Sequence, residues 1–194
     1  TIYSLTSEND LNSDFWNDEA NTNYANDYYT SSIRKWLNND FYNTAFGKSE
    51  KSSIDVTHLD NSAYNNDSSK YDGKDCDDKI FLLSFKDILN AQYGFNSDSE
   101  TEDISRRTSG TDYAKCQGLG VESFMGNQKE LLTAKGKNPT EWWLRSAGSK
   151  SYSAVCVPYT GRAVNYSYTG LVSTTTYGIR PALKFVEGYN FNKE

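Results

Sequence analysis

The residues best suited to acid–base or nucleophilic chemistry are a lone histidine and the carboxylates beside it. His58 is the only histidine and lies in the sequence VTHLD, between Asp55 and Asp60. A nucleophilic enzyme needs a base next to its nucleophile, and no GxSxG turn accompanies this group. We therefore expect a structural or surface role for His58, and we do not expect the protein to be an enzyme. Loss of an activity on mutating His58 or Cys156 would revive the enzyme alternative.

The cysteines and two acidic loops are the candidate metal ligands. Cys76, Cys116 and Cys156 are scattered without CxxC spacing, and a single histidine cannot complete a zinc site with them. Three reduced thiols are the simplest expectation, and one disulfide with a free thiol is the alternative. The acidic loops 72–78 and 98–103 lack the residue order of an EF-hand. We expect solvated loops and neither a metal nor another cofactor, with a structural calcium left open.

Composition places the chain among folded, loop-rich proteins. The 14% aromatic content is too high for a disordered chain, and 194 residues suit a single domain. The net charge of −6 argues against nucleic-acid binding, because that affinity comes from neutralising phosphates. No run of 18 apolar residues is present, so no membrane insertion is expected.

Apolar spacing and capping residues predict several elements. The clearest helix begins after a cap at Ser31 or Ser32 and ends at Gly47, and a short helix is expected from Ser49. Further helices are predicted over 85–91, capped by Ser84, and over 112–117, capped by Thr111. Strands are predicted at 2–5, 54–57 and 80–84, and as short strands within 142–183. Residues 7–30, 60–78, 96–103 and 118–140 are expected to be loops.

Helices near the start and strands near the end predict an α+β fold. We expect two main helices to pack on one side of a small and mostly antiparallel sheet. Ordered long loops commonly carry function, so the loops between the last strands are the first place to look for a site.

The segment Trp142–Leu183 has the composition of a binding surface. Its 29 residues from Ser149 to Tyr177 include five Tyr, five Ser and five Thr. Tyr offers a large, stiff contact area and Ser adds adaptable hydrogen bonding, as in antibody paratopes. From Trp142 to Val186 there are five Lys or Arg and no acid, so this part carries +5 and the rest of the chain −11. These cations could be held structurally within strands or could form a patch for an acidic ligand.

Several stretches together resemble one group of proteins. WWLRSAG (142–148) and GIRPAL (178–183) resemble the two ends of the variable region of C-type-lectin-fold proteins diversified by retroelements. SSIRKWLNNDFYNTAF, DKIFLLSFKDI and TDYAKCQGL resemble the scaffold of the same group, in the branch related to formylglycine-generating enzymes. The resemblance covers most of the chain and is weakest over 1–27, 60–75 and 94–105.

The resemblance implies a single C-type-lectin-like domain over 1–194, with a variable ligand-display region in 142–183, centred on about 149–177. In such systems a reverse transcriptase copies a template with errors at adenines, which turns Asn codons into codons for Tyr, Ser, Thr and others. The implied ligand-binding positions are Ser151, Tyr152, Tyr159, Asn165, Tyr166, Tyr168, Ser173, Thr174, Thr176 and Tyr177. The implied scaffold positions are Trp142, Trp143, Arg145, Gly161, Gly178, Arg180 and Pro181.

Members of this group bind protein or glycan ligands on a host or neighbouring cell. They lie on the virion surface at tail-fibre tips or on the cell surface, and a trimer would suit a fibre tip. The copper-binding cysteine pair of the related enzymes is missing, since only Cys156 lies in the terminal region. The calcium-binding EPN and QPD motifs of sugar-binding lectins are also missing. The alternative is an invariant adhesion or glycan-binding module of a secreted or cell-surface bacterial protein.

Overall fold

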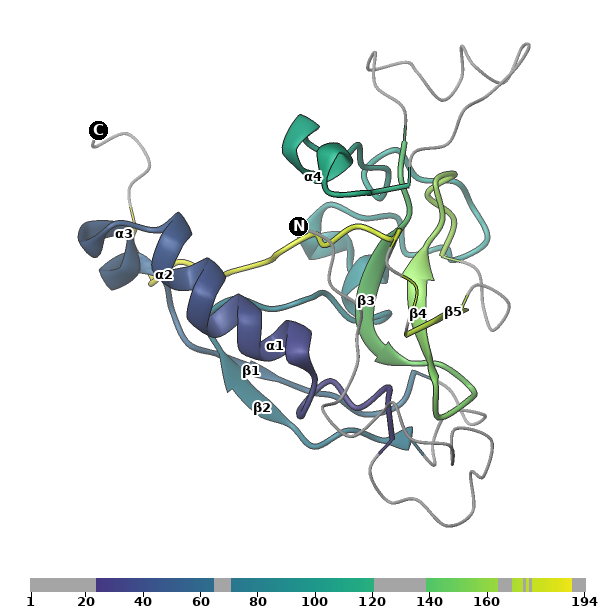
Figure 1. Cartoon of the computed structure of the whole chain (residues 1–194), viewed down its shortest axis with the longest axis horizontal. Helices are drawn as coiled ribbons and strands as arrows, with labels where there is room; N and C mark the ends of the chain where they lie inside the picture. The colour runs from purple at the N-terminus through teal and green to yellow at the C-terminus, as the bar shows by residue number, and fades with distance from the viewer. Residues whose placement is uncertain are drawn as a thin grey trace.

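The computed structural model of the chain has an α+β architecture in which a long helix and two antiparallel sheets surround a shared core (Figure 1). The predicted strand at 2–5 lies outside the residues that the structure describes. No helix within the described part of the chain is long and apolar enough to cross a membrane. The described residues are 24–64, 71–120, 139–163, 169–172, 174 and 176–189.

The predicted first helix is confirmed, with a π-helical centre that the sequence did not indicate. It runs through α1 (Ser32–Trp36), η1 (Leu37–Phe41, π-helical) and α2 (Tyr42–Ala45). The Ser31 side chain accepts a hydrogen bond from the backbone N–H of Arg34 at 3.3 Å and so satisfies one of the free donors of the first turn. Ile33 and Leu37, four positions apart, are fully buried.

A short second helix follows, as predicted. α3 (Lys48–Ser53) begins after Gly47, whose backbone N–H donates to the Glu50 carboxylate at 2.6 Å. This bond places a negative charge at the helix N-terminus, where the helix dipole favours it.

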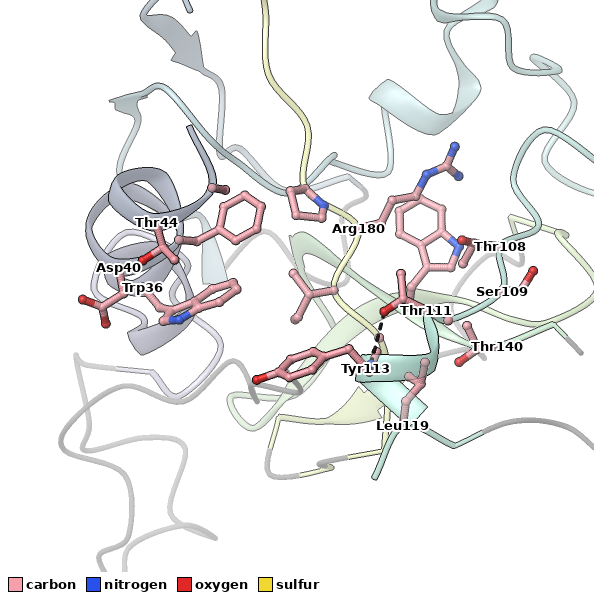
Figure 2. A pocket seen from close by; sticks show the side chains of 18 residues that line it. Trp36, Asp40, Thr44, Thr108, Ser109, Thr111, Tyr113, Leu119, Thr140 and Arg180 are labelled. Atoms are coloured by element: carbon pink, nitrogen blue, oxygen red, sulfur yellow. Dashed lines mark hydrogen bonds between the residues drawn. The ribbon is translucent and has the colours of Figure 1, made fainter. Parts of the chain in front are cut away.

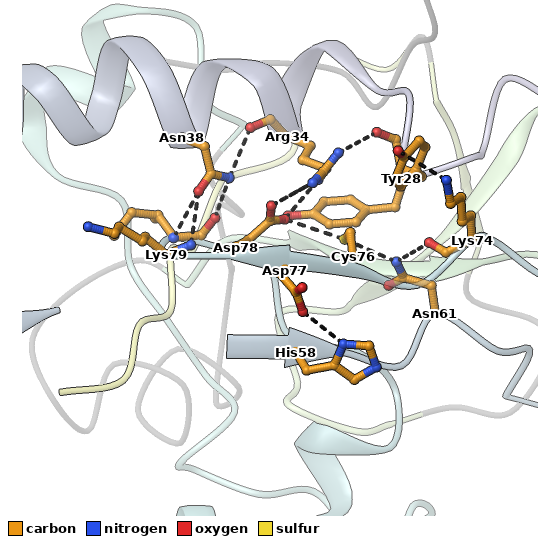
Figure 3. A network of polar contacts seen from close by, with 12 residues as sticks. Tyr28, Arg34, Asn38, His58, Asn61, Lys74, Cys76, Asp77, Asp78 and Lys79 are labelled. Carbon is orange, nitrogen blue, oxygen red and sulfur yellow. Dashed lines mark hydrogen bonds and ion pairs between the residues drawn. The ribbon is translucent and has the colours of Figure 1, made fainter. Parts of the chain in front are cut away.

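The long helix covers a two-stranded antiparallel sheet formed by β1 (Thr57–Leu59) and β2 (Cys76–Asp78). Arg34 reaches from the helix to Asp78 on β2, with Nη2 2.8 Å from Oδ1 (Figure 3). The side-chain exposures of 23% and 3% make this a largely buried pair.

Two details of this region differ from the sequence prediction. β1 begins at Thr57, so the strand predicted at 54–57 is displaced, and Ile54 instead bridges to Phe185. The predicted loop 60–78 ends in β2. The strand CDD carries too little apolar character to be recognised; it pairs with β1, and its buried Asp78 has a half-buried cationic partner in Arg34.

The helix expected over 85–91 is a wrong prediction. Two short 3₁₀ turns occur instead, η3 (Asp87–Leu89) and η4 (Ala91–Tyr93). Asn90 adopts an extended backbone between them, and its side chain accepts from the N–H of Gln92 at 2.9 Å. Asn side chains compete with the helical backbone in this way, which explains the interruption. The Ser84 cap itself is present, because its Oγ accepts from the N–H of Asp87 at 3.1 Å.

The apolar run 80–84 is buried but forms no ladder of its own. Ile80 and Leu82 are fully buried, and Phe81 makes a single antiparallel bridge with Ala182. This run therefore serves as a core segment between the two sheets rather than as the predicted strand.

The second sheet is built from the segment Trp142–Leu183, called the terminal block below, and its short strands were predicted. β3 (Trp142–Ala147), β4 (Ser153–Val157) and β5 (Thr169–Leu171) pair antiparallel in that order. Every residue of β3 and β4 is buried, and the β3–β4 register shifts between Trp143 and Ala147. These two strands contact the core on both faces, which is why their polar residues do not alternate cleanly with apolar ones.

The last elements join the parts of the fold together. α4 (Asp112–Cys116) begins after its predicted cap, where Thr111 Oγ1 accepts from the N–H of Ala114 at 3.1 Å. The described C-terminal segment, yellow in Figure 1, runs from beside β3 back toward α3. It bridges to Trp142 through Gly178, to Phe81 through Ala182 and to Ile54 through Phe185.

Candidate ligand-binding surface

Strands β3 and β4 and the scaffold residues around them, which together we call the frame, are held by burial and by hydrogen bonds. Trp142 and Trp143 are 1% and 0% exposed, and the Trp142 indole N–H donates to the backbone oxygen of Arg106 at 3.0 Å. Both tryptophans therefore act as core residues, in keeping with the scaffold role implied for them.

Arg145 is held inside this frame by several partners. Its Nη1 lies 2.6 Å from the Asp87 carboxylate and 2.8 Å from the backbone oxygen of Leu82, and its Nε lies 3.1 Å from Asn61 Oδ1. The side chain is 5% exposed. Arg145 is thus a structural cation and offers no charge to an acidic ligand.

Two other cations of this segment, Arg180 and Arg162, are also engaged. The Arg180 guanidinium lies 4.9 Å from the centroid of the Trp142 ring and donates to the backbone oxygen of Ser105 at 3.2 Å. Arg162 pairs with the Glu100 carboxylate at 3.3 Å. The structural interpretation of the +5 charge therefore holds for Arg145 and Arg180, whereas Arg162 forms an exposed pair. Burial of Arg180 lowers its pKa.

Two glycines fix the backbone of the frame. Gly161 has φ +75°, and a Cβ there would stand 2.3 Å from the backbone oxygen of Asp103. Its own carbonyl accepts from the N–H of Asp103 at 3.2 Å. Gly178 exchanges backbone hydrogen bonds with β3 and its neighbour, donating to Glu141 at 2.8 Å and accepting from Trp143 at 3.0 Å. Pro181 follows in an exposed position.

Six of the ten display positions implied by the sequence fall within the described residues, and they differ in exposure. Thr176 is exposed, while Ser151, Tyr159 and Thr174 are half-buried. The remaining two, Tyr152 and Tyr177, are half-buried and pack against the core. Asn165, Tyr166, Tyr168 and Ser173 lie outside the described residues.

Tyr152 and Tyr177 are set closer to the core than a purely outward display position would be. The rings of Tyr177 and Trp143 lie 4.9 Å apart at 54°. The backbone oxygen of Tyr152 accepts from the N–H of Val172 at 3.0 Å, which joins the β3–β4 turn to the end of β5. These two tyrosines therefore connect the candidate surface to its frame.

Asn26 is a supporting residue that the sequence did not reveal. Its side-chain nitrogen donates to the backbone oxygens of Lys150 at 2.8 Å and Ser153 at 3.0 Å, and its backbone N–H donates to that of Ser151 at 3.0 Å. It is 3% exposed. Because Asn26 lies more than a hundred residues away in a predicted loop, no local pattern could have indicated this contact.

A cleft of about 720 Å³ lies beside the frame (Figure 2). One wall comes from the long helix, the opposite wall from α4 and the segment before it, and the floor from β3 and the GIRP segment. Its aromatic and charged lining residues are Trp36, Asp40, Phe41, Tyr113, Trp142 and Arg180. The volume is in the usual range for ligand sites. Sequence reasoning missed this cleft because its lining comes from four separate parts of the chain.

Residues 5–185 match a family described as "Domain of unknown function (DUF6273)". The chain belongs to the DUF6273 family. No curated protein and no solved structure matches it. The match spans the long helix, both sheets and α4, so the frame and the cleft both belong to the DUF6273 domain.

Substituting a tyrosine that contacts the core should lower the stability of the domain more than substituting an exposed display position does. We expect Tyr177→Ala to lower the free energy of unfolding of the DUF6273 domain by about 2 kcal/mol, since it removes an aromatic pair and its buried area. Thr176→Ala, one position earlier and exposed, should change it by less than about 0.5 kcal/mol. Urea unfolding of both variants checks this, and equal losses would contradict the separation into frame and display positions.

His58 lies on the exposed side of β1, as expected for a surface residue. Its Nδ1 is 2.8 Å from the Asp77 carboxylate (Figure 3). Its Nε2 is 3.7 Å from the carboxylate of Asp75. The hydrogen bond with Asp77, aided by the nearby carboxylates, raises the pKa of His58 above its ordinary 6.5.

The hydrogen bond between His58 and Asp77 makes the stability of the fold depend on pH, with a defined sign. Because the folded-state pKa of His58 is raised, its stabilising contribution is complete below the unfolded-state pKa and disappears as pH rises through the folded-state pKa. An NMR titration of the one histidine of the DUF6273 domain should give a pKa above 6.5 that falls in Asp77→Asn. A pKa unchanged by this substitution would show that the hydrogen bond does not form in solution.

The metal and thiol predictions can be compared with the described residues. Within them, no group of three or more His, Cys, Asp or Glu is placed to hold a metal ion. Cys76, Cys116 and Cys156 are all free, so the expectation of three reduced thiols is met and the disulfide alternative is not. Cys76 and Cys156 are buried, and burial raises the pKa of both thiols.

Proposed function

We propose that this DUF6273 domain is a ligand-binding display protein with a C-type-lectin-like fold. Its segment 149–177 is diversified by retroelement mutagenesis and presents a variable surface to a protein or glycan ligand. The observation that carries the proposal is a fully buried β3–β4 frame whose connecting segments hold half-buried or exposed Tyr, Ser and Thr.

The frame supplies what a variable binding surface needs. Trp142, Trp143 and Arg145 are anchored by the core, by a carboxylate and by backbone oxygens, and among the described display side chains Tyr177 packs against one of them, Trp143. Binding then costs little ordering entropy, because the surface is organised before the ligand arrives. Residues such as Ser151, Tyr159 and Thr176 can change without touching these contacts.

The ligand is a protein or glycan on a host or neighbouring cell, and the domain lies on a virion tail fibre or on a cell surface. Nucleic acid is disfavoured by the net charge of −6. Three of the five cations between Trp142 and Val186, namely Arg145, Arg162 and Arg180, are paired within the domain and so contribute little to an anion site. Recognition therefore rests on tyrosine area and hydroxyl hydrogen bonds.

Tolerance to change at the display positions tests the binding function. We expect a library that randomises Ser151, Tyr159, Thr174 and Thr176 to remain folded in most members and to yield binders to a probe protein such as lysozyme. A matched library at Trp142, Leu144, Val155 and Val157, which are all buried, should be mostly unfolded. Protease resistance on the surface of yeast measures folding, and labelled lysozyme measures binding. A folded first library without any binder would contradict the proposal.

The gene's surroundings separate this function from its alternative. Diversification requires a nearby reverse-transcriptase gene and a near-repeat of the terminal coding segment that differs at adenines. If neither is found, an invariant adhesion or glycan-binding module remains.

A further inference from the structure

We propose that the cleft beside the frame binds a basic side chain, an arginine guanidinium, presented by an extended partner polypeptide. The cleft lies outside segment 149–177, so this inference goes beyond the display function and holds whether or not that segment varies.

The helix wall of the cleft is shaped by the π-helical turn. Hydrogen bonds from i to i+5 bring Phe41 beside Trp36, and the two ring centroids are 5.1 Å apart. Asp40, four positions after Trp36, lines the same wall. π turns within α-helices are frequent at functional sites, and this one brings two rings and a carboxylate to a single cavity.

The opposite wall adds a third ring. Tyr113 extends from α4 toward the helix wall and is 63% exposed (Figure 2). Thr111 and Ala114 line the cleft beside it. A cation between ring faces is attracted by their quadrupoles, and tryptophan and tyrosine are the strongest partners.

The charges around the cleft favour a cation over an anion. Asp40 is exposed and forms no ion pair with any residue that the structure describes. Among the described residues that line the cleft, Arg180 is the one cation, but its guanidinium lies over Trp142 and donates to Ser105, away from Trp36 and Asp40 in Figure 2. The net charge of −6 adds long-range attraction for a basic partner.

Arginine fits the walls better than lysine does. Its planar, weakly hydrated guanidinium stacks on aromatic faces and can also bond a carboxylate. The inner end of the cleft already contains this arrangement, with Arg180 4.9 Å from the centroid of Trp142. A volume of about 720 Å³ exceeds one side chain, which indicates a peptide segment rather than a free amino acid.

Two capped peptides test the charge requirement. Acetyl-Gly-Gly-Arg-Gly-Gly-amide and its citrulline counterpart have nearly the same shape, but citrulline is neutral. In NMR titrations of the full chain at millimolar peptide, we expect the arginine peptide to shift the signals of Trp36 and Tyr113. It should bind at least about fivefold more tightly than the citrulline peptide, the size of an exposed cation–π contact. Equal affinities, or no shifts with either peptide, would overturn the proposal.

Substitutions locate the binding. Tyr113→Ala and Asp40→Asn alter exposed side chains, and each should weaken the arginine peptide about fivefold with an unchanged melting temperature. Tyr93→Ala removes another exposed tyrosine and Asp112→Asn another exposed carboxylate, both outside the cleft, and neither should change the affinity. Equal weakening by all four variants would show non-specific attraction and overturn the site. None of these measurements involves segment 149–177, so their failure would leave the display function standing.

Discussion

Replacing Arg145 with methionine should lower the free energy of unfolding by about 3–5 kcal/mol. The Arg145 side chain is 5% exposed and lies within hydrogen-bond distance of Asp87, Leu82 and Asn61. Methionine fills much of the volume but leaves the Asp87 carboxylate and the Leu82 oxygen without this partner. A buried charge that loses its partner is costly, whereas the same pair at a surface contributes little.

Arg162 provides the matched control for this substitution. It also pairs with an acid, Glu100 at 3.3 Å, but the two side chains are 43% and 60% exposed. We expect Arg162→Met to cost less than about 1 kcal/mol. Urea unfolding, with a shift in midpoint at constant slope, measures both variants. Similar losses for Arg145→Met and Arg162→Met would contradict the role of Arg145 as the buried anchor of the frame.

Replacing Gly161 with alanine should cost about 2–4 kcal/mol, the sum of a left-handed backbone penalty and overpacking. Gly161 has φ +75°, and its added Cβ would stand 2.3 Å from the Asp103 oxygen and 3.0 Å from Arg107 Cγ. Because the first obstacle is backbone, the turn or the loop at Asp103 has to move. The buried Arg106, whose Nη1 donates to the Gly161 oxygen at 3.3 Å, would then lose a partner.

Gly188→Ala is a control that separates the left-handed backbone penalty from the overpacking. Its φ is +80°, yet nothing lies within 4 Å of its Cβ position, so Gly188→Ala carries only the backbone penalty of about 1 kcal/mol. The difference between the two variants in the free energy of unfolding, measured in urea, gives the cost of the close contact between Gly161 and Asp103. Equal effects would show that this turn is not packed against the loop at Asp103.

Local signals in the sequence predicted an element correctly where residues next to it in the chain cap it or form its buried face. Ser31 and Thr111 cap the helices that follow them, and the spacing of Ile33 and Leu37 indicates the buried face. The composition of the terminal block likewise indicated short strands there, and the α+β class followed from the order of the elements.

Features that depend on distant partners could not be predicted. β2 pairs with β1 and its buried Asp78 binds Arg34 from the long helix, and the β3–β4 turn is held by Asn26. Asn90 interrupts an apolar pattern that otherwise reads as a helix. The π turn at Leu37–Phe41 leaves no mark on apolar spacing, so the cleft that it shapes could not be foreseen either.

For the candidate surface, the sequence indicated which segment to examine but not how each side chain is used. Tyr152 and Tyr177 were grouped with Thr176 by composition alone, and the structure places both tyrosines against the core. Arg145 and Arg180 were counted as charges, and both are held by groups of the domain itself. Burial, which depends on the whole fold, separates frame from display.

Sequencing the terminal coding segment in many cells of the source population tests whether segment 149–177 is diversified. We expect amino-acid changes concentrated at display positions such as Ser151, Tyr159 and Thr176, each at a codon with an adenine in the template copy. Trp143, Arg145 and Gly161 should stay unchanged. A segment that is invariant across the population, or one that changes as often at Trp143 and Arg145 as at Thr176, would contradict it.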